Sequence, residues 1–225
     1  MSIAVKITVF LDRITPLFLK RVFFVGMSRL GYYLLHKHKL IAVHNLTRSF
    51  PEKPLKEIRQ IIKDAYANFA LFFAEFLRVP LLNSNNLNRW VTVKGLEHYE
   101  KACLEGRGVL LFSAHFGNWE FGNAALAILS RPPVFMARKL DSPFLEELTT
   151  QARTPLGIRN LHKEQAMRSL LPLLRKGEPV LLLIDQNVAA REGVFIEFFG
   201  REACATTGVA LMALHTQAAV LPIFT

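Results

Sequence analysis

Residues 109–120, VLLFSAHFGNWE, decide the fold class of this chain. The apolar run Val109–Ser113 is short and follows a glycine, which predicts a buried β-strand. Gly117 then turns the chain, and Asn118 is a residue type that caps helices, so a helix is expected to begin there. A buried strand that leads through a tight turn into a helix is a building unit of α/β proteins with parallel sheets.

The same alternation continues along the chain. Further strands are predicted at 90–94, 134–137, 179–184, 194–198 and 219–224, and helices at 96–105, 118–130, 142–154, 163–175 and 207–216. The expected fold class is therefore α/β, with a largely parallel sheet flanked by helices. Ligands of such sheets bind beyond the carboxyl ends of the strands, so polar residues in those places are candidate site residues.

Composition limits the class of protein further. The chain has 225 residues, of which 51% are hydrophobic, and its mean hydropathy is +0.24. These values exclude a disordered or fibrous protein and suit one domain with a sizeable core. Two cysteines cannot form a disulfide framework, which favours a reducing compartment. The formal net charge of +10 is compatible with a nucleic-acid binder or with a protein of the membrane surface.

The distribution of the charge favours the membrane. Residues 1–63 carry 12 Lys and Arg but three acids, and apolar residues rich in Phe and Leu lie between the cations at helical spacing. Residues 1–50 are thus predicted to be a basic amphipathic helical segment, broken at Pro16, that lies in an anionic membrane interface. No uncharged run in 1–39 exceeds seven residues, which is too short for an ordinary span. A core helix with solvated cations remains the alternative, whereas nucleic-acid binding is disfavoured because the Phe residues lie inside apolar runs.

The rest of the chain, residues 51–225, is expected to form the α/β domain. It begins with a predicted helix whose apolar residues recur at alternating steps of three and four: Leu55, Ile58, Ile62, Ala65, Phe69, Phe72 and Phe76. The polar stretch 83–88 is the best candidate linker. Residues 203–225 carry no Lys, Arg, Asp or Glu, but their Thr, His, Gln and Pro favour a buried helix and a buried strand over a membrane span. Because the last residues fall inside a predicted strand, we expect the sequence to be incomplete at its C-terminus.

His115 is the strongest candidate for chemistry. It follows a predicted strand, and Glu120 lies in the first turn of the next helix, where the dipole favours a carboxylate. A turn at Gly117 would let Glu120 fold back and accept the imidazole N–H, leaving the other ring nitrogen as a base for a substrate hydroxyl. On spacing alone, a purely structural His–Glu pair is the stronger interpretation. No metal is expected, because His36, His38 and His44 in the basic segment have no cysteines or carboxylates beside them.

The amino-acid sequence of residues 113–120 favours the catalytic interpretation of His115 and Glu120. Ser113–Glu120 resembles the His-x4-Asp/Glu motif of glycerolipid acyltransferases, in the His-Phe-Gly-Asn-Trp-Glu form of the bacterial lipid A biosynthesis late acyltransferases, the lauroyl/myristoyl transferase family. Further blocks that resemble this family are Asn45-Leu46, Phe50-Pro51-Glu52, Gly95-Leu96-Glu97, Gly106-Arg107-Gly108, Ala137-Arg138-Lys139, Arg153, Leu182-Leu183-Ile184-Asp185-Gln186-Asn187, Phe198-Phe199-Gly200 and Thr206-Thr207-Gly208. The basic N-terminus departs from the family in lacking the clean membrane span of some members.

The resemblance implies an O-acyltransferase that needs no cofactor. It implies transfer of a fatty acyl group from acyl carrier protein, or from acyl-CoA, to a hydroxyl of a lipid A precursor. His115 would be the general base and Glu120 would orient it. The helix start at Gly117 and Asn118 would suit a phosphate or the tetrahedral oxyanion.

The later blocks imply further substrate contacts. Arg138 and Arg153 are candidates for phosphate contacts of the acceptor. Asp185 and Gln186 end a predicted strand, as site residues do. The alternatives are a solvated helix-end charge for each arginine and a turn role for Asp185.

The expected partners are the acidic carrier protein, steered by the basic face, the glycolipid acceptor and an anionic membrane surface. The expected location is the cytoplasmic face of the inner membrane, in a peripheral or monotopic position. Two alternatives stay open. The acceptor is another glycolipid or a lysophospholipid, or the chain is a non-enzymatic basic lipid-binding module.

Overall fold

A computed structural model describes residues 2–162 and 166–225 of the chain, with side chains for all of them except 166–168. The chain forms two compact units. The first comprises Met1–Ile7, Arg78–Phe195 and Cys204–Thr225, and the second comprises Thr8–Leu77 and Ile196–Ala203.

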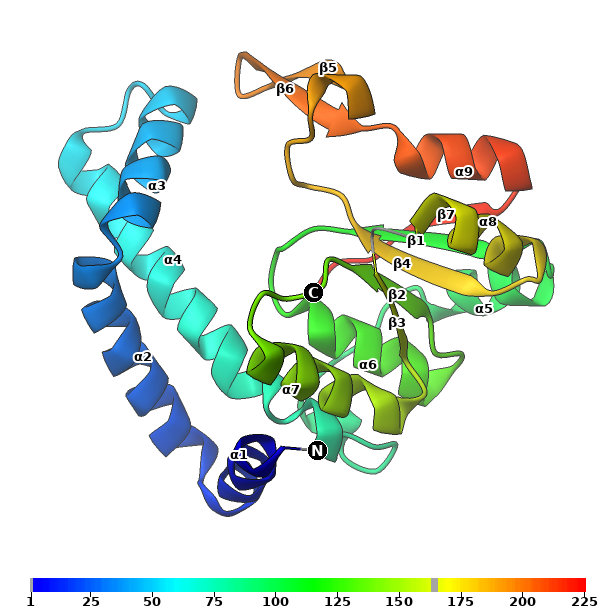
Figure 1. The fold of residues 1–225 in the computed structure, drawn as a ribbon, viewed down its shortest axis with the longest axis horizontal. Helices are drawn as coiled ribbons and strands as arrows, with labels where there is room; N and C mark the ends of the chain where they lie inside the picture. The colour runs from blue at the N-terminus through cyan, green and yellow to red at the C-terminus, as the bar shows by residue number, and fades with distance from the viewer. Residues whose placement is uncertain (1, 163–165) are drawn as a thin grey trace. The chain divides into compact units, whose positions relative to one another are not determined.

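The first unit contains a five-stranded sheet (Figure 1). Its strands are β1 (Val109–Ser113), β2 (Val134–Ala137), β3 (Arg159–His162), β4 (Pro179–Leu183) and β7 (Ala219–Pro222). Their order is β3-β2-β4-β1-β7, and all neighbouring pairs are parallel. The predicted α/β class with a largely parallel sheet is confirmed. Because the strands are parallel, the segments that follow them meet at one edge of the sheet.

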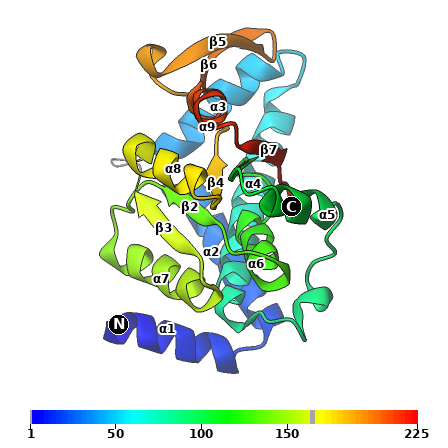
Figure 2. The same cartoon turned by 90° about the vertical axis from the view of Figure 1, so that its right-hand side faces the viewer.

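Helices cover both faces of this sheet, as Figures 1 and 2 show. They are α5 (Leu96–Leu104), α6 (Trp119–Leu129), α7 (Pro143–Arg153), α8 (Ala166–Arg175) and α9 (Gly208–Thr216). Leu111 of β1 packs in a cluster with α5 and α6, whereas Leu110 packs in the opposite layer with α8 and α9. Successive residues of β1 thus face different helix layers, which explains why the strand is apolar almost throughout.

The second unit is built from helices. Its elements are α2 (Leu17–Leu34), α3 (His36–Ser49) and α4 (Leu55–Phe76), with α1 (Ile3–Ile14) contributing its residues from Thr8 onward. The predicted break at Pro16 is confirmed, because α1 ends before this residue and α2 begins after it. Tyr32, Ile58 and Ile62 form the buried cluster between α2 and α4, which lie alongside each other in Figure 1.

The predicted apolar stripe of α4 is only partly buried. Ile58, Ile62 and Phe76 are buried, but Leu55 and Phe69 are exposed. One cation of the N-terminal basic segment is buried: Lys20 of α2 forms an ion pair with Asp12. Across the residues that the structure describes, no helix is both long enough and apolar enough to cross a membrane.

Several predicted elements differ from the observed ones. Residues 90–94 are not a strand: they follow the short 3-10 helix η2 (Leu87–Arg89), and Trp90 packs on Phe121 of α6. Strand β3 was not expected, because its sequence RNLH has one apolar residue, which an edge strand tolerates. Strand β6 (Arg201–Thr206), which pairs with the predicted strand β5 (Gly193–Phe198), was not expected either.

Two further predictions need correction or completion. The helix predicted at 163–175 is observed from Ala166, and residues 163–165 lie outside the described part of the chain. A helix and a strand do follow residue 203, as α9 and β7. They are not buried throughout, however, because Leu211, Leu214 and Val220 are exposed.

Candidate active site

Two parallel neighbouring strands bring His115 and Asp185 together. Ser113, the last residue of β1, pairs with Leu183, the last residue of β4. His115 and Asp185 each lie two residues beyond these ends. The Asp185 carboxylate accepts a hydrogen bond from the His115 backbone N–H at 3.0 Å, and its other oxygen lies 2.8 Å from His115 Nδ1. The carboxylate therefore fixes both the backbone and the ring of His115.

This contact decides which ring nitrogen is available for chemistry. A carboxylate beside Nδ1 favours the tautomer that carries its proton there, which leaves Nε2 unprotonated. Both side chains are a little more than one-third exposed, so a hydroxyl group can reach them from solvent. An exposed imidazole with its back nitrogen on a carboxylate is the arrangement of a general base.

Glu120 does not make the predicted contact with His115. Its carboxylate is 3% exposed and accepts hydrogen bonds from the Arg153 guanidinium, one of them from Nε at 3.0 Å. Among the described hydrogen bonds none joins Glu120 to His115. The prediction of a direct His115–Glu120 hydrogen bond is therefore wrong. The physical reason is that α6 starts at Trp119 and directs Glu120 toward α7, where a buried cation neutralises it.

Arg153 is likewise placed differently from its predicted role. It is buried at 6% exposure, donates a hydrogen bond to Asn160 Oδ1 at 2.8 Å, and stacks its guanidinium 4.1 Å from the centre of the Phe135 ring. Its donors are thus engaged inside the protein. We correct the predicted phosphate contact: Arg153 links α6, α7 and the β2–β3 pair, and it does not present its guanidinium to a ligand.

The start of α6 has the predicted form. Gly117 adopts a positive φ of 60°, and the side chain of Asn118 caps the helix by accepting a hydrogen bond from Phe121 N at 3.3 Å. The next residue, Trp119, packs its ring edge-on against the His115 ring with centroids 5.0 Å apart. The positive end of α6 therefore begins beside the imidazole, where it can stabilise an anion.

Arg138 follows β2 at the same edge of the sheet. Its exposed guanidinium donates two hydrogen bonds to Asp141, at 2.8 and 3.0 Å. These hydrogen bonds, and then the positive charge itself, hold the pKa of the Asp141 carboxyl below its usual range. Arg138 is thus available to solvent, but its guanidinium is shared with a local carboxylate and does not contact His115.

The remaining predicted residue, Gln186, is exposed next to Asp185. Asn187 was not singled out from the sequence, and its side chain accepts a hydrogen bond from Cys204 N at 2.7 Å, which ties the segment after β4 to β6. In the described part of the chain no group of three His, Cys, Asp or Glu side chains could hold a metal ion.

The sequence pointed to the residues of the site but not to the contacts between them. His115, Glu120, Arg153 and Asp185 were all singled out, but Asp185 was not assigned to His115, nor Arg153 to Glu120. The missing signal was the order of the strands: only the adjacency of β1 and β4 shows that the segments after them meet. Asn160, which holds Arg153 from β3, carried no signal because its strand was not expected.

The fold and the site define a class of protein. It is an α/β protein with helices on both faces of a parallel sheet and a histidine–carboxylate pair at the carboxyl edge of the strands. The model of the bacterial lipid A biosynthesis acyltransferase family matches residues 2–225. The chain belongs to this family.

Curated relatives agree with this assignment. The lipid A biosynthesis lauroyltransferase of Escherichia coli K12 is 26% identical over 198 residues, which cover 88% of this chain and 64% of that protein. A lipid A biosynthesis acyltransferase of Haemophilus influenzae is 27% identical over 88% of this chain and 63% of its own length. A phosphatidylinositol mannoside acyltransferase of Mycolicibacterium smegmatis is 27% identical over 80% of this chain and 60% of its own length. The chain thus spans less than two-thirds of these relatives.

Proposed function

We propose that this chain carries the catalytic site of an O-acyltransferase. The enzyme moves a fatty acyl group from acyl carrier protein, or from acyl-CoA, to a hydroxyl of a lipid A precursor. Family membership supports the class of reaction. The observation that carries the mechanism is the double contact of the Asp185 carboxylate with His115, which leaves Nε2 of the imidazole free to act as a base.

The proposed step is a direct transfer. Nε2 of His115 removes the proton of the acceptor hydroxyl while the hydroxyl oxygen attacks the thioester carbonyl of the donor. Asp185 stabilises the imidazolium that forms, as the carboxylate of a catalytic triad does. The tetrahedral intermediate then expels the thiolate, which takes the proton back from the imidazolium. The products are the ester and the free thiol, and no cofactor takes part.

The positive end of α6 has a role in the same step. The backbone at Gly117 and Asn118 lies next to His115 and would stabilise the oxyanion of the intermediate or a phosphate of the acceptor. Arg138 and Gln186, both exposed near the carboxyl edge, are proposed to contact the acceptor. Glu120 supports the site indirectly, since its ion pair with Arg153 fixes the first turn of α6.

We further propose that α1 and α2 bind the cytoplasmic face of the inner membrane peripherally. Exposed large apolar residues on α2 include Phe18, Val22 and Phe23, each more than 60% exposed. Lysines and arginines lie among them, and the two signals together are typical of helices in an anionic interface. Binding there would place the chain on the surface that holds a lipid acceptor.

A panel of donors and acceptors tests the function. The full chain would be incubated with a labelled acyl group on carrier protein or on CoA, and with a lipid A precursor or a lysophospholipid as acceptor. We expect transfer to the lipid A precursor, at a higher rate from carrier protein. Binding of the acceptor without any transfer from either donor would instead indicate a lipid-binding module and would contradict the proposal.

A second acceptor class has specific support. Three of the curated relatives are named phosphatidylinositol mannoside acyltransferases. A phosphatidylinositol mannoside therefore belongs in the acceptor panel. Faster transfer to this glycolipid than to the lipid A precursor would keep the mechanism and replace the acceptor.

A further inference from the structure

The segment that follows β7 reaches the same site as the segment that follows β4. In the sheet β1 lies between these two strands, and the segment after β4 supplies the carboxylate that contacts His115. On the other side of β1, Phe112 pairs with Pro222 of β7, and the Ile223 N–H donates a hydrogen bond to the Phe112 carbonyl oxygen at 3.0 Å. The chain from there to Thr225 therefore continues beside the loop after β1, and Figure 1 marks Thr225 next to α6.

Thr225 packs against two glycines at the start of α6. A Cβ on Gly117 would overlap the backbone carbonyl oxygen of Thr225 and would lie 3.4 Å from its Oγ1. A Cβ on Gly122 would lie 2.9 Å from Thr225 Cγ2, which is closer than ordinary van der Waals contact. The hydroxyl of Thr225 is thus near the turn before α6, and its methyl group is near the helix itself. Gly117 and Gly122 leave the space that Thr225 fills.

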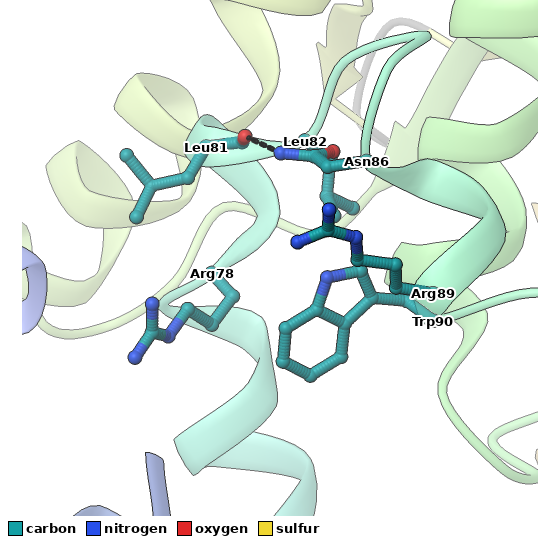
Figure 3. Close-up of a pocket in the computed structure, with 6 residues that line it drawn as sticks. All are labelled: Arg78, Leu81, Leu82, Asn86, Arg89 and Trp90. Carbon is teal, nitrogen blue, oxygen red and sulfur yellow. Dashed lines mark hydrogen bonds between the residues drawn. The ribbon is translucent and has the colours of Figure 1, made fainter. Parts of the chain in front are cut away.

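The turn at Gly117 depends on this contact more than the helix does. The first turn of α6 is held by the ion pair of Glu120 with Arg153 of α7. It is also held by Phe121, which packs on Trp90, a residue in the wall of the cavity drawn in Figure 3. Gly117 has a positive φ of 60° and no side chain that could anchor it. The atoms nearest to its Cβ direction all belong to the segment after β7.

We propose that Thr225 is a positioning residue for the acyl transfer. It holds the turn at Gly117 and Asn118 so that the backbone N–H groups at the start of α6 are directed at the oxyanion of the tetrahedral intermediate. The inference rests on the proposed function and adds a residue after β7 to the site. Oriented donors are sensitive to small shifts, since a misplacement of about 1 Å can cost about 100-fold in rate. His115 is held separately by Asp185, so a change at Thr225 should leave the base intact.

Steady-state kinetics of the full chain, with acylated carrier protein and a lipid A precursor, test this role. Thr225→Ala removes both branches of an exposed side chain, so the variant should fold. We expect its kcat to fall about tenfold, because the oxyanion donors lose their alignment. The KM for the acceptor and the pH at which kcat is half-maximal should not change, because acceptor binding and the base are unaffected. Gly106→Ala, whose added methyl group meets no atom within 4 Å, should keep the wild-type kcat.

A double-variant cycle links the effect to the contact with Gly122. Gly122→Ala adds a methyl group that must displace the methyl group of Thr225. We expect its kcat to fall about tenfold, although alanine favours a helix more than glycine does. Thr225→Ser removes the methyl group of Thr225 and keeps the hydroxyl. The double variant Gly122→Ala with Thr225→Ser should therefore regain most of the rate that Gly122→Ala alone loses.

Three results would overturn the positioning role of Thr225. The first is a kcat of Thr225→Ala equal to that of wild type, which decides the matter even if Gly122→Ala fails to fold. The second is a raised KM or a shifted pH profile of Thr225→Ala with kcat retained. The third is additive losses of the two substitutions in the cycle. Absence of transfer by the wild-type chain from either donor would instead contradict the proposed function, and this inference with it.

Discussion

The orientation of His115 depends on a carboxylate from a neighbouring strand. Asp185 contacts both the ring and the backbone N–H of the histidine. A single residue thus sets the tautomer of the imidazole and the conformation of the loop after β1. Because the residues are about one-third exposed, we expect the pair to contribute little to folding stability.

Asp185→Asn should slow acyl transfer by about 100-fold or more, because an amide cannot stabilise the imidazolium as a carboxylate does and can favour the wrong tautomer. The melting temperature should change little. Steady-state rates and thermal melts of the same preparations measure the two effects. The matched control is Glu105→Gln, a partly exposed carboxylate paired with Arg107 at the amino end of β1. A rate for Asp185→Asn that equals that of this control would contradict the assignment.

The Glu120–Arg153 pair, unlike the His115–Asp185 pair, is expected to matter mainly for folding stability. Both side chains are almost fully buried, so removing one charge leaves the other without compensation. Glu120→Gln or Arg153→Met should each destabilise the protein by about 3–5 kcal/mol. Urea unfolding measures this loss, and Arg138→Ala, which breaks an exposed pair, should leave stability near that of wild type.

The double variant Glu120→Gln with Arg153→Met tests the coupling directly. Since it removes both charges, it should be clearly more stable than the sum of the single losses predicts. Additive losses would show that the two residues act independently, contrary to the observed hydrogen bonds.

The sequence identified the individual site residues but not which of them contact each other. His115 and Glu120 are five residues apart, and a local turn was the simplest way to join them. Sequence spacing reports local proximity, whereas Asp185 lies 70 residues from His115 along the chain. That contact depends on which strands are neighbours, which no single motif records.

The backbone conformation of the glycine turn before β1 affects how closely α8 packs. Gly106 and Gly108 both have positive φ, at 71° and 80°. A Cβ on Gly108 would lie 2.3 Å from the carbonyl oxygen of Leu174 in α8, whereas a Cβ on Gly106 would meet no atom within 4 Å. The turn therefore allows α8 to approach the start of β1 closely.

Gly108→Ala should destabilise the protein by about 2–5 kcal/mol, the sum of the left-handed backbone and the clash with Leu174. Gly106→Ala is the matched control and should cost only about 1–2 kcal/mol, since it adds backbone strain alone. Denaturant unfolding of both variants gives the difference. Equal losses would mean that the close approach of α8 does not constrain this turn.

Elements with a strong pattern were predictable. The apolar strands β1, β2 and β4 and the long helix α4 match their predicted residues closely, because central parallel strands and amphipathic helices impose clear periods. Strand β3 escaped prediction since an edge strand tolerates polar residues. The run at 90–94 has the alternation of a strand, but Trp90 packs on α6 instead.

For the molecule as a whole, charge and exposed apolar surface coincide in the N-terminal helices. We expect binding to vesicles of anionic lipid that weakens as salt rises, because each Lys or Arg near the surface contributes about 1 kcal/mol within a Debye length of about 10 Å at 0.1 M salt. Sedimentation with vesicles at low and high salt measures this. Binding that does not respond to salt would contradict a peripheral, electrostatic mode.

The contribution of the exposed apolar side chains to vesicle binding can be tested separately from that of the charges. Phe23→Asp should reduce vesicle binding strongly, because a buried aromatic side chain contributes about 1.5–3 kcal/mol and a carboxylate is repelled by anionic lipid. The control is Leu104→Asp, which changes an even more exposed leucine on α5. If both variants lose binding equally, α2 is not the membrane-binding element.

His115 is the proposed base of the acyl transfer. The most direct test is a single-turnover measurement of transfer from acylated carrier protein to a lipid A precursor by wild type and His115→Ala, with melting temperature and acceptor affinity measured on the same samples. We expect the rate of His115→Ala to be lower by about 10²–10⁴-fold with fold and affinity retained, since the imidazole acts in the transition state. A folded His115→Ala variant that keeps most of the wild-type rate would contradict this role.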